Sequence, residues 1–281
     1  LINESIRLTQ ESRRVLAQLL AIAEGRYTVG QGTQADVLKA QTQLAKMSDE
    51  LLRMERERPM MEAELSKLTG RTRTPRRFAV QLPSLPEVAI SYESLRELAL
   101  QRRPQLLGLR TVIDRGSAAI ELARKEYQPD FEIRAQYGQR ESMLDGTRRP
   151  DMMSLTLAIN VPLWGKSKID PRIAEARAMR DQALAMVEAQ EHEVSAKLQQ
   201  QIAIAEQSRK SAQLYASAIV PQAELAFEST LSAYRVSRAD LPMLLDSQMS
   251  VFTYRIGQAT AIVNFNKALV EIDLLTGVAP I

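Results

Sequence analysis

The first seventy residues predict two helices that are joined by a short turn. Apolar residues stand three or four positions apart over residues 1–27, which is the spacing of an amphipathic helix. A stretch with two glycines follows, and Thr33 or Asp36 can begin the next helix by accepting a hydrogen bond from its first turn. We expect that helix to end near Thr69, because Gly70 suits the left-handed conformation that commonly follows a helix.

Helical spacing is interrupted by an irregular stretch and then returns. Residues 71–91 contain three prolines among basic and small residues, which predicts a linker. The helical pattern resumes over residues 92–127, with a pause at Pro104.

A very long helix is predicted in the second half of the chain. The helical pattern runs from about residue 168 to 236, and we expect breaks only at Pro171 and Pro221. At about 1.5 Å per residue, such a helix is on the order of 100 Å long. This length predicts a coiled-coil or tubular assembly rather than the interior of a globule. After a turn over residues 234–240, a second helix returns to Thr276.

Between these helices the period of the pattern changes to two. Apolar and polar residues alternate over residues 129–138 and 153–163, on either side of a polar loop that contains Asp145 and Gly146. This alternation predicts an antiparallel β-hairpin of about nine residues per strand, the length of a tilted strand in a membrane barrel. Its predicted membrane face consists of Phe131, Ile133, Leu155, Leu157, Ile159, Val161 and Trp164, with Tyr127 and Trp164 at the rims. The predicted fold is therefore mostly α, with long antiparallel coiled-coil helices and one amphipathic β-hairpin.

Two parts of the chain repeat one pattern. RYTVGQGTQADVLKAQTQL around Tyr27 matches AYRVSRADLPMLLDSQMSV around Tyr234 without a gap, at an offset of 207 residues. Gly70 and Gly277 lie at equal distances after the two tyrosines, and each follows Leu-Thr. We therefore predict two copies of one unit. The predicted organisation is a first copy at residues 1–70, a linker at 71–91 and a second copy at 92–277 with the β-hairpin at about 129–163.

The first copy is the shorter one. The offset aligns Leu1 with Ser208, so the counterpart of residues 92–207 is missing from the first copy. We expect the parent protein to be longer at its N-terminus by on the order of 120 residues.

Composition and charge exclude several classes of function. The 37 basic and 34 acidic residues are interleaved, and no dense basic stripe indicates a nucleic-acid partner. Cysteine is absent, which suits an oxidising periplasm. With one histidine, His192, and no phosphate-binding loop or metal-ligand spacing, the sequence predicts no enzyme. We accordingly expect no catalytic residue, no cofactor and no resident metal.

Several motifs are similar to those of the TolC family of outer-membrane efflux ducts. YQPDF at residues 127–131 resembles the entry into that family's barrel strands, and NVPLWG at 160–165 resembles the exit from them. The motifs that begin at Tyr27 and Tyr234 resemble the two helix-turn-helix tips at the family's periplasmic entrance. The resemblance covers essentially the whole chain except the linker, and the second tip is similar to members that serve metal-exporting pumps. The sequence is identified as an N-terminally truncated member of this family.

The resemblance implies an assembly and a location. It implies a homotrimer that forms a β-barrel in the outer membrane of a Gram-negative bacterium and a helical tunnel in the periplasm. A periplasmic adaptor and an inner-membrane pump would dock to it and pass substrates through it. One hairpin per chain gives a trimer only six strands, fewer than the eight of the smallest known membrane barrels, so we expect the given chain not to form the pore alone.

The resemblance also implies a gate at the periplasmic tips. Acidic rings from Asp36 and Asp246 would favour cations there. Ser237 stands where the family has glycine, and Met243 holds its acidic position nine residues after the tyrosine, so we expect a weaker or differently built gate. The predicted tip residues are Tyr27, Gly30, Asp36, Tyr234, Ser237 and Asp246.

Other interpretations of these residues stay open. The aspartates can simply favour the helix dipole, and the tyrosines can be packing residues. The methionines can fill helix seams rather than line a copper path, and residues 53–58 can be a solvated helix face rather than an adaptor-docking surface. The alternative function is a coiled-coil scaffold that conducts nothing, although a scaffold needs neither the β-hairpin nor the matched turns.

Overall fold

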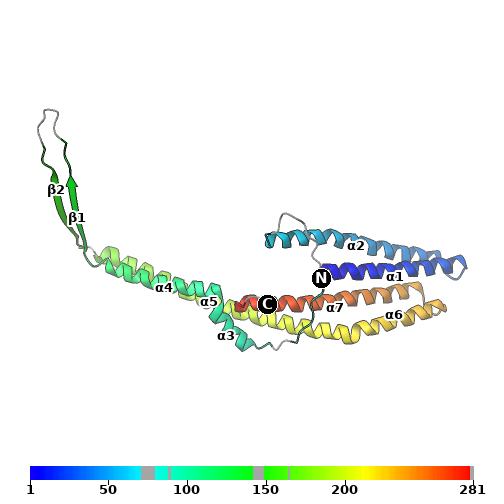
Figure 1. Cartoon of the computed structure of the whole chain (residues 1–281). Helices are drawn as coiled ribbons and strands as arrows, with labels where there is room; N and C mark the ends of the chain where they lie inside the picture. The colour runs from blue at the N-terminus through cyan, green and yellow to red at the C-terminus, as the bar shows by residue number, and fades with distance from the viewer. Residues whose placement is uncertain (71–79, 88–89, 142–148, 164, 279–281) are drawn as a thin grey trace. The chain divides into compact units, whose positions relative to one another are not determined.

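The computed structural model describes residues 1–70, 80–87, 90–141, 149–163 and 165–278 (Figure 1). Trp164, the Asp145-Gly146 turn and most of the predicted linker lie outside the described residues. The elements in chain order are α1 (Ile2–Thr28), α2 (Gln34–Leu68), α3 (Tyr92–Arg102), α4 (Pro104–Lys125), β1 (Asp130–Gly138), β2 (Met152–Asn160), α5 (Gly165–Leu214), the π-helix η1 (Tyr215–Ile219), α6 (Val220–Arg235) and α7 (Leu241–Thr276). None of the described helices combines the length and the apolar character that a membrane-spanning helix needs.

Contacts divide the chain into two units. One unit consists of Leu1–Leu95 and Lys197–Ile281, and the other of Arg96–Ala196. In the first unit, α1 and α2 form an antiparallel pair that we call hairpin 1, and α6 and α7 form a pair that we call hairpin 2 (Figure 1). The two hairpins lie against each other mainly through α1 and α7.

A hydrophobic cluster lies beneath the turns of both hairpins. Its members come from α1, α2, α6 and α7, so this cluster joins the two hairpins. Burying one such leucine side chain stabilises a protein by about 1.5–3 kcal/mol. The fully or nearly fully buried members are Leu16, Leu19, Ala23, Ala40, Met47, Tyr234, Leu241, Leu244 and Leu245.

The predicted break near Pro221 has an unexpected form. We expected one helix that stops at this proline, whereas α5 ends at Leu214, a π-helical turn follows, and α6 begins at Val220. Pro221 has no amide hydrogen for the α-helical pattern, and a wider turn immediately before it changes the pattern of bonds there. In this turn the Tyr215 ring lies on Gly257 of α7, where a Cβ atom would come within 2.8 Å of Tyr215 Cζ.

The expected break at Pro171 is wrong. Helix α5 runs without interruption from Gly165 to Leu214 and includes Pro171. The proline lies near the helix start, where a missing amide hydrogen removes one bond without dividing the helix.

The second unit contains α4, the β-hairpin and the first part of α5. Helices α4 and α5 pack closely at Gly116, where a Cβ atom would lie 3.2 Å from the Cα atom of Arg180. Ala123, Ile169 and Ile173 form a small buried cluster nearer the hairpin. Where α5 begins, the Tyr127 hydroxyl donates a hydrogen bond of 2.6 Å to Asp170 Oδ1, which also raises the pKa of Tyr127.

Strands β1 and β2 form the predicted antiparallel hairpin. Phe131 pairs with Ile159 and Ile133 pairs with Leu157, so these four side chains share one face. The predicted membrane-face residues that the structure describes are all more than half exposed in the single chain. The alternation therefore predicted the hairpin correctly, and the assignment of its apolar face to a membrane stays a prediction.

Candidate functional site

The turns of the two hairpins have the same backbone conformation. Gly30 follows α1 with φ +75°, and Ser237 follows α6 with φ +61°. These positions are equivalent in the repeat. Ser237 is the one non-glycine residue with positive φ among the described residues, and a side chain there costs about 1–2 kcal/mol. The serine therefore keeps the geometry of the glycine that it replaces, at an energetic cost.

The hydrogen bonds of the two turns also match. In each turn the left-handed residue donates to the carbonyl three residues before it, and the next residue donates to the carbonyl five residues before it. This is the Schellman pattern, which satisfies the last carbonyls of a helix. The four bonds are Gly30 to Tyr27 at 3.0 Å, Gln31 to Arg26 at 2.8 Å, Ser237 to Tyr234 at 3.1 Å and Arg238 to Ala233 at 2.8 Å.

Helix capping explains why the second turn has Met243 at the position where the first turn has Asp36. In the first turn, Thr33 is the N-cap of α2, and the Asp36 carboxylate accepts from the Thr33 amide at 3.1 Å and its hydroxyl at 2.7 Å. In the second turn, the N-cap is Asp240, whose Oδ1 accepts from the Met243 amide at 3.0 Å. The acidic group has therefore moved by three residues, from inside the first helical turn to the cap itself.

Arg26 joins the two turns. Its guanidinium lies over the Tyr234 ring, 4.5 Å from the ring centroid. It donates one hydrogen bond to the Tyr234 carbonyl and another, of 2.7 Å, to Ser237 Oγ. It also reaches the carbonyl of Gln31 in its own turn at 3.3 Å. One arginine of hairpin 1 thus holds the turn of hairpin 2 through its backbone, a hydroxyl and an aromatic face.

Arg26 was not among the predicted tip residues. The signal was present in the repeat, because the position equivalent to Arg26 in the second copy is Ala233. The two copies therefore differ at this position, with an arginine side chain in the first turn and an alanine in the second. This is also the position at which the first turn contacts the second.

The two predicted gate tyrosines have different environments. The side chain of Tyr27 is 48% exposed, whereas Tyr234 is 4% exposed and belongs to the hydrophobic cluster. Burial raises the pKa of the Tyr234 hydroxyl, and the charge of Arg26 partly offsets that rise. Tyr234 is therefore a packing residue of the hydrophobic cluster, whereas the side chain of Tyr27 is accessible to solvent or to a partner.

The two predicted gate aspartates also differ. Asp36 is half-buried and its carboxylate belongs to the cap of α2. Asp246 is exposed in the second turn of α7, and its carboxylate has no hydrogen-bond partner among the residues that the structure describes. Of the two, Asp246 is the one whose charge is directed to solvent.

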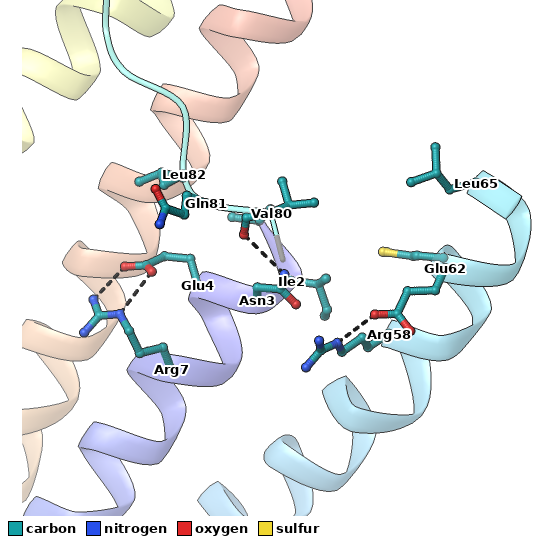
Figure 2. Close-up of a pocket in the computed structure, with 12 residues that line it drawn as sticks. Ile2, Asn3, Glu4, Arg7, Arg58, Glu62, Leu65, Val80, Gln81 and Leu82 are labelled. Atoms are coloured by element: carbon teal, nitrogen blue, oxygen red, sulfur yellow. Dashed lines mark hydrogen bonds and ion pairs between the residues drawn. The ribbon is translucent and has the colours of Figure 1, made fainter. Parts of the chain in front are cut away.

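A cavity of about 460 Å³ lies at the other end of hairpin 1, near Leu1 and the last turns of α2 (Figure 2). Its charged side chains are already paired within their own helices, Arg7 with Glu4 at 2.6 Å and Arg58 with Glu62 at 3.1 Å. Within the described part of the chain, no group of three or more histidine, cysteine or acidic residues is placed to hold a metal ion. This cavity therefore presents paired charges and apolar walls rather than a reactive group.

Comparison with known proteins decides the family. The model of the outer membrane efflux protein family matches residues 95–278. The chain belongs to that family. A comparison with curated proteins found no match.

Solved structures show which fold this outer membrane efflux protein has. It is similar to a membrane protein from Pseudomonas aeruginosa (TM-score 0.87, 18% identity) over 99% of this chain and 63% of that one. It is also similar to VceC from Vibrio cholerae (TM-score 0.83, 17% identity) over 99% of this chain and 66% of that one. The CmeC outer membrane channel of Campylobacter jejuni is similar as well (TM-score 0.84, 13% identity), over 98% of this chain and 59% of that one. The fold is thus TolC-like, as the sequence predicted, and the chain spans about two thirds or less of the length of these structures.

Proposed function

We propose that this chain is part of an outer-membrane channel through which efflux substrates leave the cell. In this proposal hairpins 1 and 2 form the wall of a periplasmic tunnel, and the β-hairpin supplies two strands to a barrel. Family membership supports the role, and the apolar face of the hairpin supports the barrel. Phe131, Ile133, Leu155 and Leu157 are 63–75% exposed in the single chain, which is costly in water and favourable against lipid.

The proposed assembly is a homotrimer that a periplasmic adaptor and an inner-membrane pump contact. Its location would be the outer membrane and periplasm of a Gram-negative bacterium. Light scattering of the detergent-solubilised chain, with circular dichroism alongside, tests this assembly. A predominantly helical trimer supports it, whereas a helical monomer or dimer contradicts closure of the tunnel by this chain.

The observation that carries a gating role is the contact of Arg26 with the opposite turn. Hydrogen bonds from a charged donor contribute about 1.5–3 kcal/mol each, and Arg26 makes two of them to Tyr234 and Ser237 in addition to its contact with the ring. The hairpins cannot separate at their turns without losing these contacts. We infer that Arg26 holds the entrance closed, and that Tyr27, Gly30, Asp36 and Asp246 lie around it.

Conductance of the longer parent protein in planar lipid bilayers tests this role, because the given chain is not expected to form the pore alone. Arg26→Ala removes all contacts between the guanidinium and the second turn, so we expect the fraction of time in the open state to rise severalfold. Arg238→Ala is the matched control, because Arg238 is an exposed turn residue of hairpin 2 whose side chain has no partner among the described residues.

Two results would count against the proposal. If Arg238→Ala raises the open fraction as much as Arg26→Ala does, charge removal rather than the contact is responsible. If the parent protein conducts no ions, either unchanged or as the two variants, the scaffold interpretation is favoured instead.

A further inference from the structure

A second cavity lies where α1, α6 and α7 meet, between hairpin 1 and hairpin 2. Its volume is about 260 Å³. Leucine, valine and phenylalanine side chains form its apolar walls, and serine, glutamine, glutamate and arginine side chains interrupt them. The lining residues used below are Ser12, Glu11, Gln248, Glu224, Glu228 and Arg255, with Phe227 and Phe252 among the apolar ones.

Two buried polar side chains in the wall of this cavity lack partners. Ser12 is 3% exposed, and its Oγ has no hydrogen-bond partner within the described chain. Gln248 is 5% exposed, and its amide makes no hydrogen bond to any residue that the structure describes. Leaving the fully buried Ser12 hydroxyl unpaired costs about 1–3 kcal/mol, so its position at a cavity indicates that a ligand satisfies it, whereas the Gln248 amide keeps some contact with solvent.

The charges around the cavity favour a cation. Arg255 of α7 is paired with Glu11 of α1 at 2.7 Å and with Glu224 of α6 at 2.6 Å. Glu228, one helical turn after Glu224, has no ion-pair partner among the described residues. Three carboxylates and one guanidinium thus line the cavity, with Glu228 at its solvent-exposed side, so the lining has an excess of negative charge and of hydrogen-bond acceptors.

The cavity belongs to the contact between the hairpins rather than to the repeated unit. Gln248 is equivalent to Gln41, and Arg255 is equivalent to Ser48. Gln41 is exposed on α2, whereas Gln248 is buried at the cavity. The same residue type at the same position of the two copies therefore stands in two different environments.

We propose that this cavity binds a small organic ammonium ion with an apolar body. The ammonium group donates to the Gln248 carbonyl oxygen, to Ser12 Oγ and to the free Glu228 carboxylate, and the apolar body lies against Phe227 and Phe252, whose ring faces also attract a cation. The bound ion contacts residues of both hairpins and so stabilises their association. This site does not depend on the proposed channel function.

Isothermal titration of the detergent-solubilised full chain with benzylamine hydrochloride tests the proposal at neutral pH. Benzyl alcohol is the neutral probe of the same shape, and benzoate is the anionic one. We expect benzylammonium to bind at least tenfold more tightly than either. Equal binding of all three probes, or no saturable binding of benzylammonium at millimolar concentration, overturns the proposal.

A pair of variants separates binding at this cavity from uptake elsewhere. Gln248→Leu keeps the size of the side chain and removes the unpaired amide, so we expect the free protein to be as stable or more stable while benzylammonium binding falls at least tenfold. Gln41→Leu changes the equivalent exposed residue and should leave binding unchanged. If Gln248→Leu unfolds the chain, Glu228→Gln provides the second test, and undiminished binding by a folded variant contradicts the site.

Discussion

At the scale of single residues, Ser237 serves two opposing purposes. Its left-handed backbone costs about 1–2 kcal/mol, but its hydroxyl accepts a hydrogen bond from Arg26 that contributes about 1.5 kcal/mol. We expect Ser237→Gly to change the free energy of unfolding by less than about 1 kcal/mol, because relief of strain and loss of the bond nearly cancel. In an Arg26→Ala background only the relief remains, so the same change should stabilise the chain by about 1 kcal/mol.

Urea unfolding of the four proteins of this double-mutant cycle measures the difference. An identical effect of Ser237→Gly in both backgrounds would mean that the bond to Arg26 contributes nothing to stability.

The sequence predicted the roles of residues that act locally but not of residues that act across the fold. Thr33 and Gly70 have local roles, a cap and a left-handed turn; the sequence predicted Gly70 and offered Thr33 as one of two caps, because capping depends on residues next to each other in the chain. Arg26 binds a residue 208 positions away, and Gln248 lines a cavity together with residues of the other hairpin. Such roles depend on tertiary packing, which a local pattern does not contain.

At the scale of elements, two glycines of α4 test how closely α4 and α5 pack, because one of them lies against α5 and the other does not. A Cβ atom on Gly116 would lie 3.0 Å from Arg180 Cβ and 3.2 Å from its Cα, whereas one on Gly108 would meet nothing within 4 Å. Alanine is favoured over glycine in a helix by about 1 kcal/mol. We therefore expect Gly108→Ala to stabilise the chain by about 0.5–1 kcal/mol, and Gly116→Ala to destabilise it by about 1–2 kcal/mol, since α5 backbone cannot move aside easily.

Thermal unfolding followed by circular dichroism measures both changes. Stabilisation by Gly116→Ala would show that α4 and α5 are not held at the close spacing of this structure.

The elements themselves were largely predictable, with an instructive exception. Period-two alternation located the ends of β1 and β2 to within about three residues, which is the ordinary uncertainty of element ends predicted from sequence. The prolines were weaker signals, because Pro171 lies inside α5 while Pro221 follows the π-helical turn η1. Each proline removes one backbone hydrogen bond from its helix. Only Pro221 follows a change of helix type in the described chain, and there the ring of Tyr215 also packs on Gly257.

At the scale of the whole molecule, the proposed channel makes a prediction about ion selectivity. In a trimer the exposed carboxylate of Asp246 would occur three times around the entrance, whereas that of Asp36 is held in a helix cap. Neutralising a ring of charges lowers the attraction for cations. We therefore expect Asp246→Asn to reduce the cation-to-anion permeability ratio severalfold, and Asp36→Asn to change it less while weakening the start of α2.

Reversal potentials of the longer parent protein in asymmetric salt measure this ratio in lipid bilayers. The difference between the variants should be largest below about 0.1 M salt, where the Debye length exceeds about 10 Å, and should shrink at 1 M, where it is about 3 Å. A larger effect from Asp36 than from Asp246 would mean that the cap opens in the assembled entrance and releases its carboxylate. No effect from either would place the selective region elsewhere in the tunnel, and the gate would then depend on contacts such as that of Arg26 rather than on acidic rings.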